Sequence, residues 1–429
     1  MSLSLGRPRS LPLLLLGSTA LLAVPTTASS QEVAMEPPEA SVVSSLPQVP
    51  VAFPEAWSRL SAELRDTLQA SGMVGSAWAF VKDGAVVARE TFGFADLETG
   101  RRVDEATIFH WASITKTLTG IAIMQLRDRG RLTLDDPVLH YVPELREVHN
   151  PFGPMEGITL RHLLSHSSGF RNSTWPWGGG EPWHPHEPTR WDQLVAMMPY
   201  TEILFPPGSR YAYSNPGIVF LGQVIERLSG EGWEVYVEKN ILRPLGMHRS
   251  FFDYTPYHLL KDRSNNYSVR DGIPTPGGLD FDTGITVSNG GLNAPVGDMA
   301  RYLAFLTGAG SHEERALHRV VLERSSLEEM WREVVPVEET PTLRESMGLC
   351  FFLVDVEGAR YPGHTGSQKS FQSFIYVDPL ARAGAIAAFN TTGVGPGETA
   401  RPATRTILNQ LRERMFAEIF PLFQGVEQP

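Results

Sequence analysis

The chain has a single cysteine, Cys350, among its 429 residues. One cysteine excludes an intrachain disulfide, even in an oxidising compartment. Cys350 lies in the apolar run MGLCFFLVDV, which is typical of a strand. Because a free cysteine in apolar surroundings behaves as a small hydrophobic residue, we expect a buried thiol with no nucleophilic role.

Positive charge is also scarce. The 37 lysine and arginine residues are outnumbered by 48 acidic residues, and the net charge is −11. This excess argues against a nucleic-acid partner, which would need a basic surface. The remaining composition, 42% hydrophobic and 20% charged, is typical of a globular protein with a large core.

Sequence patterns for a metal centre are missing as well. The 12 histidines form no His-Glu-x-x-His motif and have no cysteine pair beside them. Two closely spaced pairs occur, His184 with His186 in a proline-rich stretch and His162 with His166. The first pair lies in that proline-rich loop and the second lacks the adjacent glutamate of a metallohydrolase, so we interpret both as structural. The sequence thus predicts no metal and no organic cofactor.

The apolar run LPLLLLGSTALLAV at 11–24 is shorter than the about 20 residues that a membrane-spanning helix needs. It follows two arginines and precedes the small residues TTASS, an order typical of an export signal. We expect residues 1–30 to be a signal peptide cleaved near Ser30, followed by a disordered linker at 31–50. The mature protein would be secreted or periplasmic, without stable membrane insertion.

Both ends of the chain carry the pattern of an antiparallel sheet with covering helices. Apolar residues recur at helical spacing in PEAWSRLSAELRDTLQASGM, and a hairpin with Asp83-Gly84 at its turn follows. Near the other end, three strand-like runs precede TILNQLRERMFAEIF, whose apolar residues fall on one helical stripe. Between the two ends, Asn293 is a candidate cap for a helix that stops at Gly308.

The simplest assembly of these elements is an α/β fold with an inserted all-α region, in one domain at 51–425. Residues 51–110 and 331–425 form the α/β part, in which helices from both chain ends flank one antiparallel sheet. Residues 111–330 form the mostly helical part. Substrate sites tend to form in clefts between such parts, and Ser113 would lie at this boundary.

The stretch WASITKTL at the start of the helical part places Ser113 three residues before Lys116. On a helix, side chains three residues apart share one face, with Cβ atoms roughly 5 to 6 Å apart. A serine hydroxyl becomes a nucleophile when a neighbouring group takes its proton, and lysines are few in this chain. The same pattern also fits a helix N-cap followed by a solvated lysine.

A second candidate group lies in PGSRYAYSNPG, 207–217, where turn-forming residues surround two tyrosines. A lysine ammonium nearby would lower the pKa of the Tyr213 phenol and let it take the serine proton. Asn215 carries both a donor and an acceptor for the carbonyl group of a substrate. A packed aromatic turn is the alternative interpretation.

The third group is PGHTGSQKSF, just before a strand-like run. Gly366 would let the backbone approach a ligand closely. His364 and Thr365 offer hydrogen bonds to that ligand, and the amide of Ser367 would complete an oxyanion hole with that of Ser113. A glycine-rich entry into a strand explains Gly366 equally well but leaves the polar residues unexplained.

Together, the three groups resemble the motifs of the serine β-lactamase and penicillin-binding protein superfamily. Most similar is its class C β-lactamase and D-Ala-D-Ala carboxypeptidase branch, with the related serine esterases. The stretches LLSHSSGF, LRPLGM and SNGGLNAPVGDMARYL extend the resemblance to about residues 50–420. The motifs are, in chain order, Ser113-Ile-Thr-Lys116, Tyr213-Ser-Asn215 and His364-Thr-Gly366.

The resemblance implies an α/β sandwich with an inserted all-α region. It also implies that Ser113 forms a covalent acyl-enzyme with an ester, amide or β-lactam substrate, which would be a small molecule or a peptide. Lys116 and Tyr213 would transfer protons, Asn215 would position the substrate, and the third motif would line the oxyanion strand. No particular oligomeric state is implied.

Two features depart from the lactamase pattern. The lactamases usually have lysine where this chain has His364, and an imidazole that is neutral at pH 7 attracts a substrate carboxylate less than an ammonium does. His-Thr-Gly occurs in relatives that are peptidases and esterases, so a role specific to β-lactams is weakened. No residue clearly matches the deacylating glutamate of class A enzymes, which leaves water activation to Tyr213 with Lys116.

Three other kinds of protein are alternatives to this interpretation. An α/β-hydrolase would place its serine in Gly-x-Ser-x-Gly, and no serine has that context. A catalytically inactive binding protein would keep the fold without the chemistry, but such a relic is expected to have lost Ser113, Lys116 or Tyr213, and all three are present. A strict D-Ala-D-Ala carboxypeptidase shares the motifs and stays an alternative.

Overall fold

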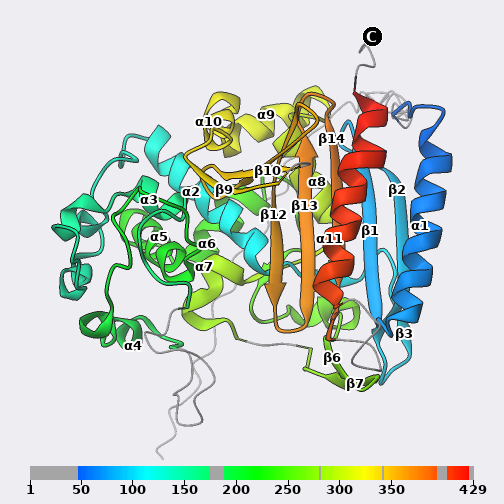
Figure 1. Cartoon of the computed structure of the whole chain (residues 1–429), viewed down its shortest axis with the longest axis horizontal. Coiled ribbons are helices and arrows are strands. Elements are labelled where there is room, and N and C mark those ends of the chain that lie inside the picture. The colour runs from blue at the N-terminus through cyan, green and yellow to red at the C-terminus, as the bar shows by residue number, and fades with distance from the viewer. Residues whose placement is uncertain (1–46, 174–187, 280–281, 341–342, 394–402, 425–429) are drawn as a thin grey trace, which may run out of the picture. The chain divides into compact units, whose positions relative to one another are not determined.

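A nine-stranded antiparallel sheet is the centre of the fold (Figure 1). The computed structural model describes residues 47–173, 188–279, 282–340, 343–393 and 403–424. The predicted signal peptide and most of the predicted linker therefore lie outside the described residues. The strand order is β3-β2-β1-β14-β13-β12-β11-β10-β9, so strands from both ends of the chain meet where β1 pairs with β14. The strands are β1 (Gly75–Lys82), β2 (Ala85–Asp96), β3 (Arg101–Arg102), β9 (Val335–Glu339), β10 (Arg344–Met347), β11 (Phe352–Val356), β12 (Ala359–Gln368), β13 (Phe371–Asp378) and β14 (Ala383–Phe389).

The hairpin of β1 and β2 forms at the predicted turn. Asp83 and Gly84 have φ angles of 48° and 84°. Two consecutive residues with positive φ are typical of a type I′ turn, whose twist matches that of the paired strands. The Asp-Gly pair in the sequence therefore fixes the register of these two strands.

Two helices from opposite ends of the chain cover one face of the sheet, as predicted. α1 (Phe53–Ala70) and α11 (Thr404–Arg414) lie side by side across it (Figure 1). Leu60 and the other buried residues of α1 pack with Trp78 of β1 in one apolar cluster. The Trp78 indole N–H donates to Ser61 Oγ of α1 at 3.1 Å, which satisfies the only polar atom of this buried side chain.

The opposite face of the sheet packs against the helical region. α8 (Val296–Thr307) contacts β1 and β14. The space between them is so tight that a Cβ on Gly384 would come within 2.5 Å of Leu303. Beyond α8, helix α2 (Thr115–Asp128) is buried along nearly its whole length and packs against α5 (Asn215–Ser229).

The inserted region is mostly helical and also contains short strands. One small sheet has the order β4-β8-β5, and another has the order β15-β6-β7. Among the described residues, no helix has both the length and the apolar character needed to cross a bilayer. The remaining α-helices and strands of the described residues are α3 (Leu160–Leu164), α4 (Trp191–Val195), α6 (Trp233–Val237), α7 (Val287–Gly290), α9 (His312–Val321), α10 (Arg324–Met330), β4 (Ile108–His110), β5 (Phe251–Phe252), β6 (Tyr267–Arg270), β7 (Ile273–Pro276), β8 (Leu292–Pro295) and β15 (Thr391–Gly393).

Asn293 does not cap α8, which corrects the expectation from the sequence. It lies within β8, and its side-chain oxygen is 2.9 Å from Nδ1 of His110 on the neighbouring strand β4. Pro295 occupies the N-cap position instead, with no side-chain cap. The cap was wrongly predicted because strand pairing competes for the same residue. The predicted end at Gly308 is confirmed, with a φ of 67°.

Leu60→Ala tests how much the outer helices stabilise the sheet. Leu60 is fully buried in the cluster between α1 and β1, so its truncation should lower the free energy of unfolding by about 2–5 kcal/mol. Urea denaturation followed by circular dichroism measures this loss. Gln69→Ala, on the exposed side of the same helix, should change the same quantity by less than about 0.5 kcal/mol. Equal losses in the two variants would contradict the packing role of Leu60.

Candidate active site

Ser113 lies on a tight turn between a strand and a buried helix. β4 leads into the 3₁₀ turn Ala112–Ile114, and α2 begins at Thr115. Ala112 has a φ of 50°, in the left-handed region that few residues other than glycine adopt. Its neighbours in the turn are buried, whereas Ser113 itself is partly exposed. The turn therefore presents one hydroxyl at the edge of a buried segment.

Hydrogen bonds from β8 fix this strained turn. The Thr115 hydroxyl donates to the carbonyl of Ala112 at 2.6 Å and accepts the amide of Leu292 at 3.0 Å. The amide of Trp111 donates to the carbonyl of Leu292 at 2.8 Å, and its indole N–H donates to the carbonyl of Ala294 at 2.9 Å. Unfavourable backbone conformations persist only where the surroundings hold them, as they do here.

Lys116 is fully buried, and its amine contacts Ser113. Nζ lies 2.9 Å from Ser113 Oγ and 2.8 Å from the carbonyl oxygen of Asn289 in α7. Because burial disfavours the charged form, the pKa of Lys116 falls from 10.5 to about 7. Near neutral pH, a large fraction of the amine is therefore uncharged and able to accept a proton.

Tyr213 reaches the same two residues from the loop that precedes α5. Its hydroxyl shares a hydrogen bond with the Ser113 side chain, and Lys116 Nζ lies 4.9 Å from the centre of its ring. Ser214, the next residue, caps α5 by accepting the amide of Gly217 at 3.2 Å. The cap fixes the backbone that carries the phenol.

The pKa of Tyr213 is raised, which is opposite to the direction expected from the sequence. Burial is the main cause, and it outweighs the hydrogen bond with Ser113, which acts to lower the pKa. The expectation assumed a lysine ammonium beside the phenol. Burial, however, also lowers the pKa of Lys116 to about 7. The phenol thus stays protonated, and the amine is the better proton acceptor.

Asn215 is the first residue of α5, and hydrogen bonds of Asn289 connect it to Lys116. The carbonyl of Asn215 accepts the side-chain amide of Asn289 at 3.4 Å, and the backbone carbonyl of Asn289 accepts the amine of Lys116. The side-chain amide of Asn215 donates to Asn172 Oδ1 at 3.2 Å. Substrate binding by Asn215 stays a prediction.

The third motif forms a strand, whereas its sequence pattern predicted a segment just before one. β12 pairs with β13 from Gly363 to Gln368, and on its other edge the pairing with β11 extends only as far as Gly363, which lies opposite Phe352, the first residue of β11. Beyond that point, this edge of β12 lies against the turn Ala112–Ile114. Glycine and proline lower the strand propensity of the motif, but pairing with two neighbours overrides that weakness.

Gly366 is required where β12 meets the Ser113 turn. A Cβ at this position would lie 2.2 Å from the carbonyl oxygen of Trp111 and 2.3 Å from Ser373 Oγ. Ser373 Oγ donates to the same carbonyl at 3.2 Å, so neither atom is free to move away. The missing side chain lets the strand edge lie directly against the turn.

His364 lies on β12 and is buried between two aromatic rings. Its ring centre is 5.0 Å from that of Phe352 and 6.2 Å from that of Tyr213. Nδ1 donates to the carbonyl of Thr365, and Nε2 has no hydrogen-bond partner in the described part of the chain. Burial, together with the charge of Lys116, lowers the pKa of His364 to about 3, so the ring is neutral at pH 7. Farther along this edge, Thr365 is partly buried and Ser367 is exposed.

Two residues of this cluster were not predicted as part of the site. The centre of the His166 ring lies 4.4 Å from that of Tyr213, although the sequence pattern indicated only a structural role for this histidine. Its motif LLSHSSGF was the only signal available. Asn289 binds Lys116 through a backbone carbonyl, and such an acceptor leaves no side-chain signature in a sequence.

The histidine pairs considered for metal binding have other places in the structure. His184 and His186 lie outside the described residues. His162 Nδ1 accepts the N-cap amide of α3 at 3.2 Å, and His166 Nδ1 accepts the amide of Ser214 at 3.1 Å. Within the described ranges, no group of three His, Cys, Asp or Glu side chains is placed to hold a metal ion.

Cys350 is buried in the turn before β11, which confirms the expected burial of its thiol. A Cβ on Gly120 of α2 would lie 3.2 Å from its Sγ. Burial raises the pKa of the thiol to about 12. The thiol therefore stays protonated at neutral pH and is a poor nucleophile.

Comparison with known proteins gives partial matches among characterised relatives. Esterase EstB from Burkholderia gladioli is 30% identical over 234 residues, which are 51% of this chain and 58% of that esterase. The chain thus spans little more than half the length of this relative. Among solved structures, an octameric penicillin-binding protein homologue from Pyrococcus abyssi superimposes with a TM-score of 0.69 at 28% identity, covering 84% of this chain and 77% of that one.

A mutant class C beta-lactamase superimposes with a TM-score of 0.66 and covers 85% of this chain and 98% of that one. At 18% identity, this likeness shows the fold alone. The sequence model of the Beta-lactamase family matches residues 60–410, a range that contains all three motifs. The chain therefore belongs to the Beta-lactamase family.

Proposed function

We propose that this protein is a serine hydrolase that forms a covalent acyl-enzyme through Ser113. The observation that carries the proposal is the buried amine of Lys116, 2.9 Å from the Ser113 hydroxyl, with a pKa of about 7. A neutral amine at this distance takes the serine proton while the hydroxyl attacks. General-base catalysis of this kind contributes roughly 10² to 10⁴-fold to the rate.

In the acylation step, Lys116 is the base and Tyr213 is the acid. Ser113 Oγ bonds to the carbonyl carbon of the substrate, and its proton moves to Lys116 Nζ. The bond to the leaving oxygen or nitrogen then breaks, and that atom departs with the proton of the Tyr213 phenol. The Lys116 ammonium supplies the replacement proton. The raised pKa of Tyr213 supports this order, because its phenol carries a proton at neutral pH.

Two backbone amides, those of Ser113 and Ser367, form the proposed oxyanion hole. The contact between the edge of β12 and the Ser113 turn supports this assignment, since Gly366 brings the two segments together. Amides held in place before the reaction stabilise the charge that develops on the carbonyl oxygen, and losing one such donor costs roughly 10² to 10³-fold in rate.

Deacylation uses the same pair of side chains. Neutral Lys116, with Tyr213, takes a proton from water as the water oxygen attacks the acyl carbon. Ser113 Oγ leaves and recovers its proton, which returns both partners to their starting states. The proposed steps use side chains and backbone amides of this chain alone.

Esters are the substrate class that we propose first, before D-amino-acid peptides and β-lactams. The neutral ring of His364 offers less attraction to a substrate carboxylate than a lysine would, and the relative EstB is an esterase. Asn215, His364 and Thr365 would bind the polar groups of the acyl chain. We also propose export to the periplasm or the medium, on the pattern of residues 1–30.

Ser113→Ala should abolish turnover of p-nitrophenyl butyrate while leaving the fold intact. The nucleophile is lost, so the rate should fall by at least about 10³-fold. Ser58→Ala, on the exposed side of α1, is the matched control and should retain full activity. Thermal unfolding verifies that both variants fold. Undiminished turnover by Ser113→Ala would refute the acyl-enzyme, and a fluorophosphonate that labels no serine would favour a binding protein.

Activity should rise with pH through about 7. Lys116 must be uncharged to accept a proton and its pKa is about 7, so kcat/KM should increase roughly tenfold per pH unit well below that value and level off above about 8. Lys116→Arg keeps a charge that cannot be removed in this range and should be inactive throughout. A pH–rate profile, corrected for spontaneous hydrolysis, measures this. A rate that decreases from pH 6 to 8 is incompatible with the amine as base.

His364→Lys should shift preference toward substrates that carry a carboxylate. An ammonium in place of the neutral imidazole should raise the ratio of kcat/KM for nitrocefin to that for p-nitrophenyl butyrate by roughly tenfold. His364→Gln, which is polar but uncharged, serves as the control and should leave the ratio unchanged. Equal effects of the lysine variant on both substrates would contradict this account of position 364.

A further inference from the structure

His166 contacts Tyr213 and both of its neighbours in the chain. Its ring lies over the phenol ring, with centres 4.4 Å apart and a 31° angle between the planes. Nδ1 accepts the amide of Ser214 at 3.1 Å, and the carbonyl accepts the amide of Ala212 at 2.8 Å. One histidine thus fixes the backbone before and after the phenol and packs on the phenol itself.

This position of His166 is costly to the fold. Its φ is 52°, in the left-handed region that glycine and asparagine adopt more readily. Because Nδ1 accepts a hydrogen bond, the ring proton is on Nε2, and that atom is buried without a hydrogen-bond partner in the part of the chain described. Burial lowers the pKa of His166, which keeps a second cation away from Lys116. A glycine at this position would close the turn without the backbone strain and without an unpaired N–H.

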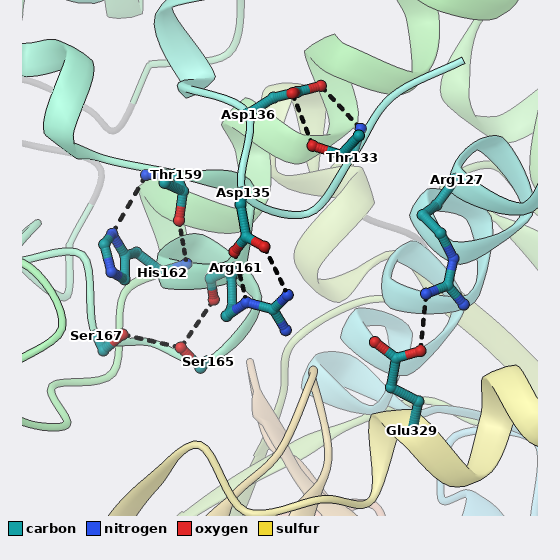
Figure 2. A network of polar contacts seen from close by, with 10 residues as sticks. All are labelled: Arg127, Thr133, Asp135, Asp136, Thr159, Arg161, His162, Ser165, Ser167 and Glu329. Carbon is teal, nitrogen blue, oxygen red and sulfur yellow. Dashed lines mark hydrogen bonds and ion pairs between the residues drawn. The ribbon is translucent and has the colours of Figure 1, made fainter. Parts of the chain in front are cut away.

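A polar network holds the turn that carries His166 (Figure 2). Arg161 of α3 forms a two-point ion pair with Asp135, at 2.8 and 3.1 Å. The hydroxyl of Ser165 donates to the carbonyl of Arg161 at 2.8 Å. The turn is therefore attached to α3, and α3 is attached to the loop that precedes it.

We propose that His166 is a positioning residue for Tyr213. The contacts of His166 hold the phenol of Tyr213 at hydrogen-bond distance from Ser113. This inference rests on the proposed function, because it concerns the proton transfer assigned to Tyr213. A displacement of about 1 Å at a reacting group lowers rates by roughly 10²-fold. A merely structural histidine would change stability and leave the contribution of the phenol unaltered.

Two substitutions separate the contacts of His166, and both suit its left-handed backbone. His166→Asn keeps a side-chain oxygen for the amide of Ser214 and loses the ring. His166→Gly loses both. With p-nitrophenyl butyrate, kcat should fall roughly tenfold in the first variant and roughly 10²-fold in the second, with KM changed by less than about twofold.

A double-mutant cycle with Tyr213→Phe decides between positioning and structural support. In that background the phenol hydroxyl is already gone, so adding His166→Gly should lower kcat by less than about threefold. An undiminished loss of roughly 10²-fold would overturn the proposal, because the effect would then be independent of the phenol. Wild-type kcat in His166→Gly would overturn it too. Should His166→Gly fail to fold, the cycle with His166→Asn decides at the tenfold level.

His162→Asn is the matched control. His162 lies four residues earlier, its Nδ1 also accepts a backbone amide, and a Cβ on Gly208 would lie 3.0 Å from its Nε2. The variant should keep kcat within about twofold of wild type, and a loss as large as that of His166→Asn would overturn the proposal. Activity in Ser113→Ala, or wild-type kcat in Tyr213→Phe, would refute the proposed function itself. Losses of His166→Gly and Tyr213→Phe that simply add in the double mutant would refute only the role of His166.

Discussion

The removal of the Lys116 amine from water is the interaction on which the site depends. In water this amine is protonated at neutral pH. Inside the protein, burial lowers its pKa to about 7, and its two hydrogen-bond partners are the Ser113 hydroxyl and the Asn289 carbonyl. A buried, partly charged amine weakens the fold, and the packing around α2 has to offset that cost. Such a trade of stability for reactivity is common at functional sites.

Among the residues that the structure describes, burial shifts the pKa of the ionisable groups around the serine, and Lys116 is the one left to titrate near pH 7. The pKa values of the acids move up, as for Tyr213 and Cys350, and those of the imidazoles move down, as for His364. Lysine alone starts far enough above neutrality for the same effect to bring its pKa to about 7. Opposite shifts of this kind separate the acid from the base.

Local patterns in the sequence were sufficient to predict the outer parts of the fold and to identify the family. The Asp83-Gly84 turn and the end of α8 at Gly308 follow from backbone preferences that neighbours do not override. That the third motif forms strand β12, and that Asn293 lies in a strand and does not cap a helix, depends on partner strands elsewhere in the chain. The pKa direction of Tyr213 was wrong for a similar reason, because burial is a property of the folded chain that spacing does not reveal.

The geometry around Ser113 is also a product of distant segments. Ala112 and His166 hold left-handed backbone angles, and Gly366 permits a contact that no side chain would allow. Neither left-handed conformation is favourable in isolation, and all three features depend on distant segments. Each is held from another part of the chain: β8 fixes Ala112, the α3 network fixes the His166 turn, and the central sheet fixes Gly366. Precision at the serine therefore requires that the sheet from the two chain ends and the helical region be packed together, so the same tertiary contacts stabilise the fold and align the reacting groups.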